Sequence, residues 1–193
     1  MDHLLTDVEV RILGSLIEKE LTTPDHYPLS LNALTNACNQ TSNRDPVVHY
    51  DENTVAGAIE ALRKRSLVRV VQQSGSRVFK YRHLVNETLG LVTRQTAVLS
   101  VLMLRGPQTV AELRTRSERL YPFSSADDVA ATLAGLAERE LVAEGSRHRW
   151  VQLLGGGAEE PEPHSPHPAS SDLEARVAEL ERIVGELQRR LDD

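Results

Sequence analysis

The sequence has few of the residues that support covalent or redox chemistry. Cys38 is the only cysteine among 193 residues, so the chain has no internal disulfide and no set of thiolates that could hold a metal ion. A single cysteine is typical of a small buried apolar residue. A weaker alternative is a redox or small-molecule sensor that uses the Cys38 thiol.

Aromatic side chains and long apolar runs are also scarce. Seven residues are Phe, Trp or Tyr, so the cores must be built from Leu, Val, Ile and Ala. No run approaches the roughly 18 apolar residues of a membrane span, and the start MDHLLTDVEV is acidic and amphipathic, unlike a signal peptide. We therefore expect a cytoplasmic protein that has no membrane partner.

Motifs of common enzymes are missing as well. There is no phosphate-binding loop, no HExxH metal motif and no Gly-x-Ser-x-Gly elbow. The polar residues of the predicted connectors match no catalytic spacing; they are His26, Cys38, His49, Asp51 and Glu52. We therefore predict that the protein is not an enzyme and uses no catalytic residue, no cofactor and no metal.

The chain as a whole lacks the positive charge that favours nucleic-acid binding. Its formal net charge is −6, but residues 154–193 hold 4 basic and 10 acidic side chains and account for the imbalance. Between Asn53 and His83 the balance is reversed, because seven cations face one acid, Glu60. We call these cations the basic patch: Arg63, Lys64, Arg65, Arg69, Arg77, Lys80 and Arg82. Such a local excess is typical of a surface that contacts phosphates.

What the sequence does contain is a pattern of short amphipathic helices. Apolar residues recur at helical spacing in three early segments, each preceded by a residue that can cap a helix. The first segment starts with a capping box formed by Thr6 and Glu9 and ends before Pro24. The third is capped by Asp51 or Asn53.

A β-hairpin is expected after these helices. The second helix is predicted over residues 30–37, and two β-rich segments, 67–71 and 77–82, flank the turn QQSGS. Three helices and a hairpin make a winged helix-turn-helix, which we place in residues 1–88.

The pattern then recurs in residues 89–154, which we assign to a second winged-helix domain. VAGAIEALRKRSLV (55–68) aligns without a gap with VAATLAGLAERELV (129–142), offset by 74 residues and with six identities. A second, shorter hairpin is expected over 141–153. The sequence therefore predicts a mainly α chain with small β-hairpin wings, an α+β fold of two tandem winged-helix domains.

The carboxyl-terminal segment has a different composition. Residues 155–171, GGGAEEPEPHSPHPASS, have little to bury and read as a flexible linker. In residues 172–193 apolar residues alternate by four and three, which predicts a coiled-coil helix. Its seam would be Leu173, Val177, Leu180, Val184, Leu187 and Leu191. So short a coiled coil is marginal, and it either pairs two copies as a homodimer, which we favour, or docks on another protein or on the chain itself.

DNA binding would place the third helix in the major groove and the hairpin on the backbone or minor groove. The basic patch would then pair with phosphates; alternatively its members are solvated charges that stabilise a helix end. The outward face of the third helix offers few groups that read bases: Asn53, Gly57, Glu60, Ala61 and Lys64. In the second domain the outward face suits packing against protein: Asp127, Ala131, Ala134, Gly135 and Glu138.

The polar stretch ACNQTSNRDPVVHYDENTV (37–55) connects the second and third helices. Asn, Asp, Ser and Thr usually cap and turn the chain, and Pro46 excludes helix before it, so a structural connector is the favoured interpretation. The alternative is a contact loop for nucleic acid, which together with Asn53 would use Asn39, Gln40, Asn43 and Arg44.

Several long motifs carry a family resemblance. TTPDHYPLSLNALTNACNQTSNRDPV (22–47), RVFKYRH (77–83), LRGPQTVAELRTRSERLYPF (104–123) and the terminal heptads resemble the YceH-like bacterial proteins, a family of uncharacterised function. The resemblance covers nearly the whole chain and implies two winged-helix domains in tandem. It implies no ligand, activity or catalytic residue.

Two functions remain open from the sequence. The first hypothesis is a non-enzymatic DNA-binding or transcription-associated protein whose basic patch meets phosphates. The second is a protein-interaction scaffold that uses the tandem winged helices and the coiled coil.

Overall fold

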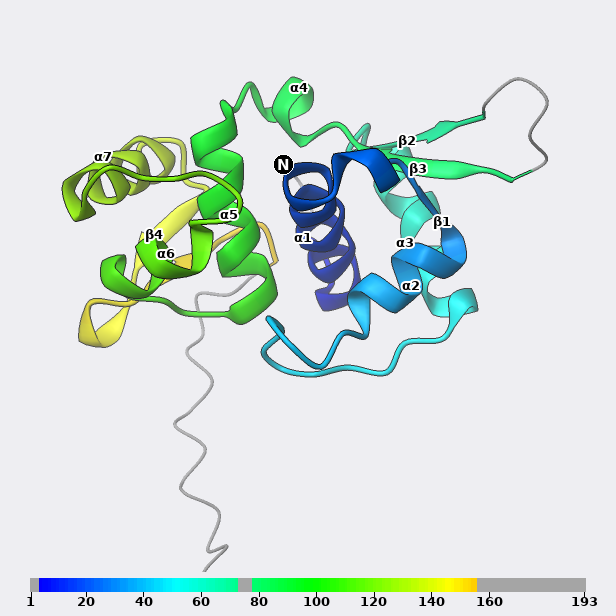
Figure 1. Cartoon of the computed structure of the whole chain (residues 1–193), viewed down its shortest axis with the longest axis horizontal. Helices are drawn as coiled ribbons and strands as arrows, with labels where there is room; N and C mark the ends of the chain where they lie inside the picture. Colours follow the sequence, from blue (N-terminus) through cyan, green and yellow to red (C-terminus); the bar gives the residue numbers. More distant parts are fainter. Residues whose placement is uncertain (1–3, 73–77, 156–193) are drawn as a thin grey trace, which may run out of the picture. The chain divides into compact units, whose positions relative to one another are not determined.

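The computed structural model describes residues 4–72 and 78–155, which belong to one compact unit, Met1–Ala158 (Figure 1). A second unit, Glu159–Asp193, lies outside the described residues, as do the predicted coiled-coil seam, nearly all of the predicted linker, and Arg77. The described part is mostly helical, with seven α-helices and two small antiparallel sheets, which confirms the α+β class. None of its helices is long and apolar enough to cross a bilayer.

The first half of the described chain, residues 4–89, contains the three expected helices. They are α1 (Asp7–Thr22), α2 (Leu31–Cys38) and α3 (Glu52–Lys64), with a 3-10 turn η1 (Pro24–His26) after α1. The predicted capping box starts α1, since the Thr6 N–H donates to Glu9 Oε2 over 2.7 Å and the Glu9 N–H donates to Thr6 Oγ1 over 3.3 Å. Ser30 caps α2 and Asp51 caps α3, which decides between the two predicted caps of the third helix.

A three-stranded antiparallel sheet completes the first half. Its strands are β1 (Leu29–Ser30), β2 (Val68–Val71) and β3 (Lys80–His83), in the order β1-β3-β2. The register pairs Val68 with His83 and Arg69 with Arg82. Because side chains alternate along a strand, Val68 and His83 are buried on one face while the two arginines lie on the other.

The second half, residues 93–155, repeats this order of elements. Its elements are α5 (Thr93–Arg105), α6 (Val110–Ser117), α7 (Ala126–Ala137), β4 (Val142–Glu144) and β5 (Trp150–Gln152), with a 3-10 turn η2 (Ser146–His148) between the strands. The starts of α3 and α7 are 74 residues apart, and so are those of β2 and β4, which matches the repeat in the sequence. An antiparallel bridge between Gln108 and Trp150 takes the place of β1. The short helix α4 (Val85–Leu89), which the sequence did not predict, joins the halves.

The core runs through both halves as one cluster of apolar side chains. Its centre is the packing of α1 against α5, which lie side by side (Figure 1). Ser100 Oγ donates to the Gly14 carbonyl oxygen over 3.0 Å, and a Cβ added at Gly14 would lie 2.9 Å from Leu104 Cγ. Glycine is therefore required at this contact between the two helices.

The inward residues of α3 are those that the sequence predicted. Val55, Ile59 and Leu62 are buried, with exposed fractions of 1% or less. Their equivalents in α7 are buried in the same way: Val129, Leu133 and Leu136. The helical spacing of apolar residues thus fixed the orientation of both helices correctly.

Candidate nucleic-acid interface

The hairpin of β2 and β3 brings three members of the basic patch onto one face. Arg69 and Arg82 are directly opposite each other in the register, and Lys80 lies on the same face of β3 as Arg82. Like charges in opposite positions of an antiparallel pair destabilise it. This face therefore favours a bound anion that would neutralise it.

Ion pairs neutralise only some of these cations. Arg82 Nη2 lies 2.7 Å from Glu87 Oε1, and Arg63 Nη1 lies 2.7 Å from Glu60 Oε1. Within the described part of the chain, Lys64, Arg69 and Lys80 make no ion pair. These three cations are available to external phosphates.

Two large apolar side chains precede β3. Val78 and Phe79 are each 54% exposed, among the most exposed large apolar residues of the described chain. Such side chains insert between bases or pack on sugars when a basic hairpin enters a minor groove. The outer part of this hairpin thus combines cations with exposed apolar surface.

The outward surface of α2 and α3 is polar but has few long side chains. Asn53 and Lys64 are exposed on α3, and Gly57 between them has open space around it. On α2 the exposed Asn36 donates to Asn32 Oδ1 over 3.2 Å, and Asn32 donates to Glu52 Oε1 over 3.0 Å. Sequence reasoning missed the two asparagines of α2, whose only signal was their outward position on a short helix.

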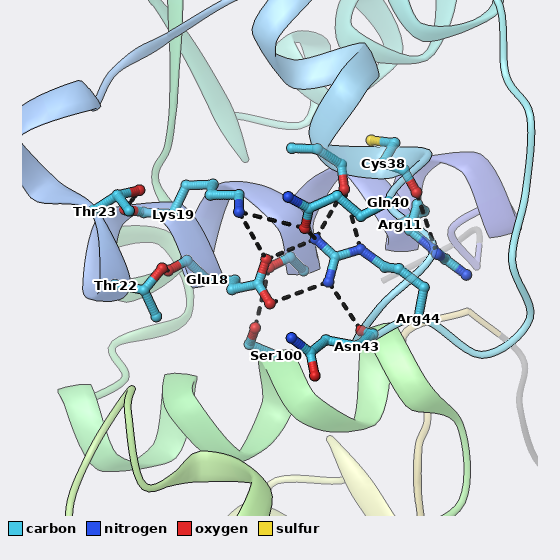
Figure 2. A network of polar contacts seen from close by, with 12 residues as sticks. Arg11, Glu18, Lys19, Thr22, Thr23, Cys38, Gln40, Asn43, Arg44 and Ser100 are labelled. Carbon is cyan, nitrogen blue, oxygen red and sulfur yellow. Dashed lines mark hydrogen bonds and ion pairs between the residues drawn. The ribbon is translucent and has the colours of Figure 1, made fainter.

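The connector between α2 and α3 is held by its own polar side chains (Figure 2). Arg44 is 6% exposed and forms a bidentate pair with Glu18, with Nη1–Oε1 and Nη2–Oε2 distances of 3.1 and 2.6 Å. It also donates to the Ala37 carbonyl oxygen from two nitrogens and to Gln40 Oε1 over 2.9 Å. These contacts support the interpretation of Arg44 and Gln40 as structural residues.

Asn39 and Asn43 are also engaged within the chain. Asn39 donates to the Tyr50 carbonyl oxygen and accepts from the Tyr50 N–H, both over 2.8 Å, so it closes the connector like a backbone pair. The exposed Asn43 accepts a hydrogen bond from Arg105 Nη2. Of the residues predicted for a contact loop, Asn53 alone has a side chain without a hydrogen bond among the described residues.

Arg65 of the basic patch lies apart from the hairpin face. Arg65 lines a leucine-rich groove beside Leu4 and donates to its carbonyl oxygen over 3.5 Å. Arg77 lies outside the described residues. The sequence grouped Arg65 with the hairpin because charge counting does not register the direction in which a side chain points.

A partly buried polar cluster anchors β3 to α1. His83 Nδ1 accepts from the Val85 N–H, so its Nε2–H donates to Glu20 Oε2 over 2.8 Å. This hydrogen bond lowers the pKa of Glu20 below its ordinary value, against the opposing effect of burial. The Tyr27 hydroxyl accepts from the His83 N–H, and burial raises the pKa of Tyr27. The base of the hairpin is thereby fixed to the first helix.

Cys38 is fully buried, and burial raises the pKa of its thiol to about 11. At neutral pH the reactive thiolate is therefore almost absent, which supports a core role. Within residues 4–72 and 78–155, no three His, Cys, Asp or Glu side chains are grouped so as to hold a metal ion.

Comparison with known proteins places the chain in a family. A family model described as "Protein of unknown function, DUF480" matches residues 5–149. The chain is 50% identical over 191 residues to a UPF0502 protein of Geotalea daltonii, covering 95% of this chain and 87% of the relative. It is 45% identical over 214 residues to one of Pelobacter propionicus (100% and 97% covered), and 48% identical over 198 residues to one of Solibacter usitatus (98% and 95% covered). The chain therefore belongs to the DUF480/UPF0502 family of uncharacterised bacterial proteins.

Proposed function

We propose that this protein is a non-enzymatic, cytoplasmic DNA-binding protein with a role in transcription. In this proposal each half is a winged helix-turn-helix, as the resemblance to the YceH-like proteins also implies. The sheet order β1-β3-β2 beside three helices, and the repetition of this order in the second half, support it. In the first half α3 would enter the major groove and the β2–β3 hairpin would be the wing.

The observation that carries the proposal is the charge of that hairpin. Arg69 faces Arg82 across the strand pair with Lys80 on the same side, and two of these three cations have no ion-pair partner among the described residues. Like charges held opposite each other lower the stability of the folded chain. DNA phosphates would neutralise these charges and so remove the repulsion. Each neutralised phosphate also releases condensed counterions, which favours binding further.

The proposed contacts favour phosphate over base recognition. On the outward face of α3, Asn53 and Lys64 are the side chains suited to contact a base, and Lys64 can equally reach phosphate. Asn32 and Asn36 at the outer face of α2 add polar groups near the same surface. We therefore expect affinity that depends strongly on salt and only modestly on sequence.

The test is fluorescence anisotropy with random-sequence duplex DNA at two salt concentrations. The doubly charge-reversed variant Arg69→Glu/Lys80→Glu should bind more weakly, and the slope of log affinity against log salt should become shallower by about 2. Arg147→Glu is the matched control, because Arg147 is an exposed cation at the turn of the second hairpin. Equal affinity of wild type and the double variant would remove the proposal.

We also propose that the predicted coiled coil pairs two copies, which would present two hairpins to one duplex. The support is the heptad spacing of residues 172–193. Leu180→Lys in the full chain would place a charge in the seam and should convert a dimer into a monomer in light scattering after size exclusion. A wild-type monomer at the same concentration would contradict this part.

A protein scaffold is the second candidate, and the surface of α7 favours it. Its exposed alanines, Ala130, Ala131 and Ala134, follow two acidic residues at its start. Small side chains permit close packing of another protein surface but offer no hydrogen bond to a base. Pull-downs after nuclease treatment with wild type and Ala131→Arg would test this role, because a partner bound at α7 should be lost from the variant.

A further inference from the structure

A polar cleft lies where the carboxyl end of α1 and the α2–α3 connector approach α5 and α6. Its volume is about 540 Å³, which is within the range of small-molecule sites. The floor is formed by Ser100, Val101 and Leu104 of α5, which are buried. Figure 2 shows one wall, with Lys19 and Asn43 on either side of the Arg44 network. The cleft is thus lined from both halves of one compact unit.

Cations predominate around this cleft. They come from three helices and the turn after α6: Lys19, Arg105, Arg116 and Arg119. Two acids line it, Glu18 and Glu118, and Glu18 is paired with the buried Arg44 and lies 3.6 Å from Lys19 Nζ. Arg116 Nη2 lies 3.5 Å from Oε1 of Glu112, which is outside the cleft lining. Arg119 is exposed and has no ion pair within the described residues. The four lining cations exceed the two lining acids, so the cleft has an excess of positive charge, although the described chain as a whole is nearly balanced.

Hydrogen bonds between the two halves hold this arrangement in place. The Asp45 N–H donates to the Leu104 carbonyl oxygen over 2.8 Å, and Arg105 donates to Asn43 Oδ1. Burial and the neighbouring charges of Arg116 and Arg44 lower the pKa of Arg105 below its ordinary value. Arg105 is thus held at the cleft before any ligand binds, which reduces its loss of freedom on binding.

We propose that this cleft binds a small ligand that carries at least two phosphate groups. Planar guanidinium groups match phosphate oxygens in bidentate fashion, and several cations around one hollow require a multivalent anion. The proposal does not depend on DNA binding by the hairpin, since the cleft and the hairpin share no residue.

These cations have an alternative role that the test must separate. Lys19, Arg105 and Arg116 lie in the last turns of α1, α5 and α6, where they would offset the negative ends of the helix dipoles. That role predicts a small change in stability when a cation is removed and no change in anion binding.

The experiment is calorimetric titration of the full chain with pyrophosphate, compared with sulfate at equal ionic strength. Wild type should bind one pyrophosphate saturably, and Arg116→Gln/Arg119→Gln should bind it at least about tenfold more weakly. Arg94→Gln is the matched control, because Arg94 is an exposed cation at the opposite end of α5. Lys19→Gln tests the opposite wall in the same way if the double variant does not fold.

Three outcomes would overturn the inference. The first is a wild-type titration without saturation, or with the same heat from sulfate. The second is equal pyrophosphate affinity in wild type and the double cleft variant. The third is loss of pyrophosphate binding in Arg69→Glu/Lys80→Glu with no loss in the cleft variant, which would place the anion on the hairpin. If the hairpin variant lost DNA binding but kept pyrophosphate binding, the two sites would be shown to be separate and the cleft proposal would stand.

Discussion

The two hairpins occupy the same place in a repeated order of elements but differ in length and charge. The first sets Arg69 against Arg82, whereas the second sets Glu144 against Trp150 in its register. In the second, Glu144 Oε1 also lies 2.9 Å from His148 Nδ1 within the short turn. The strands of the first hairpin thus carry Arg69, Lys80 and Arg82, whereas β4 and β5 carry no cation, which supports the proposal that the first hairpin contacts DNA.

The connectors differ in a second way. In the first half the segment between α2 and α3 runs over residues 39–51, and the second half spans the equivalent gap with 118–125. The longer connector contains Arg44, whose guanidinium is fully buried against Glu18. The longer connector of the first half therefore contributes a buried ion pair, and the shorter connector of the second half has no equivalent of it among the described residues.

The largest expected effect comes from breaking that pair. Arg44→Met removes the bidentate partner of the nearly buried Glu18 carboxylate and leaves it Lys19 at 3.6 Å, which should lower the free energy of unfolding by about 3–5 kcal/mol in urea denaturation. Arg63→Met removes an exposed pair with Glu60 and should change it by no more than about 1 kcal/mol. If Arg44→Met and Arg63→Met lowered the free energy of unfolding by similar amounts, the buried ion pair of the connector would be no more important for stability than an exposed one. Adding Glu18→Leu to Arg44→Met should restore much of the stability, since no lone charge then remains.

A smaller loss is expected where the halves meet. Gly14→Ala would place a Cβ 2.9 Å from Leu104 Cγ and 3.0 Å from Met103 Cβ, so α1 and α5 would have to move apart. Overpacking of this kind should cost about 1–3 kcal/mol in thermal or urea unfolding. If both halves unfold in one transition in wild type, Gly14→Ala should shift that whole transition or split it in two. An unchanged midpoint would mean that the contact between the halves does not limit stability.

Acid should weaken both halves through one carboxylate in each. The pKa of Glu20 is lowered mainly by its hydrogen bond with His83, and that of Glu112 mainly by the Thr109 N–H. A lowered folded pKa means that the unfolded chain binds protons more readily, so this stability is present above the ordinary pKa of about 4.3 and is lost as pH falls through the folded pKa. Urea unfolding between neutral and acid pH should show a flatter dependence in Glu20→Gln and in Glu112→Gln. Glu60→Gln, which removes an exposed carboxylate, is the control. If its free energy of unfolding became as insensitive to pH as that of the other two variants, Glu20 and Glu112 would not be the source of the acid sensitivity.

The smallest effect concerns the outward face of α3. Gly57 is the equivalent of Ala131 in α7, at the same offset of 74 residues, and open space surrounds it. Gly57→Ala should therefore raise the free energy of unfolding by roughly 0.5–1 kcal/mol, the usual gain in a helix interior. Reduced DNA affinity in this more stable variant would indicate that α3 uses the missing side chain for close approach to the duplex. A loss of stability would mean that α3 is not an exposed regular helix at this point.

The elements that the sequence predicted correctly are those with periodicity and a cap. Thr6 with Glu9 marks the start of α1, and the alignment around Val55 and Val129 identifies the repeat from the sequence alone. β1 and α4 were missed because two and five residues are too few to show a period.

The candidate site was predictable only in part. Residue spacing placed Arg69 and Lys80 on hairpin strands, but their common face depends on a register that only the folded hairpin defines. The buried partners Glu18 and Arg44 are 26 residues apart, and in the sequence Arg44 reads as one more polar loop residue. No local pattern reports a contact that forms only when α1 and the connector fold together.

The packing of α1 against α5 also has a consequence for the order in which the chain can fold. Ser100 meets Gly14 across 86 residues, so the surface of α1 that faces α5 stays uncovered during synthesis until the second half emerges from the ribosome. A contact of such high sequence separation forms late and leaves apolar surface exposed meanwhile. The first half therefore depends on the second for its protection during synthesis.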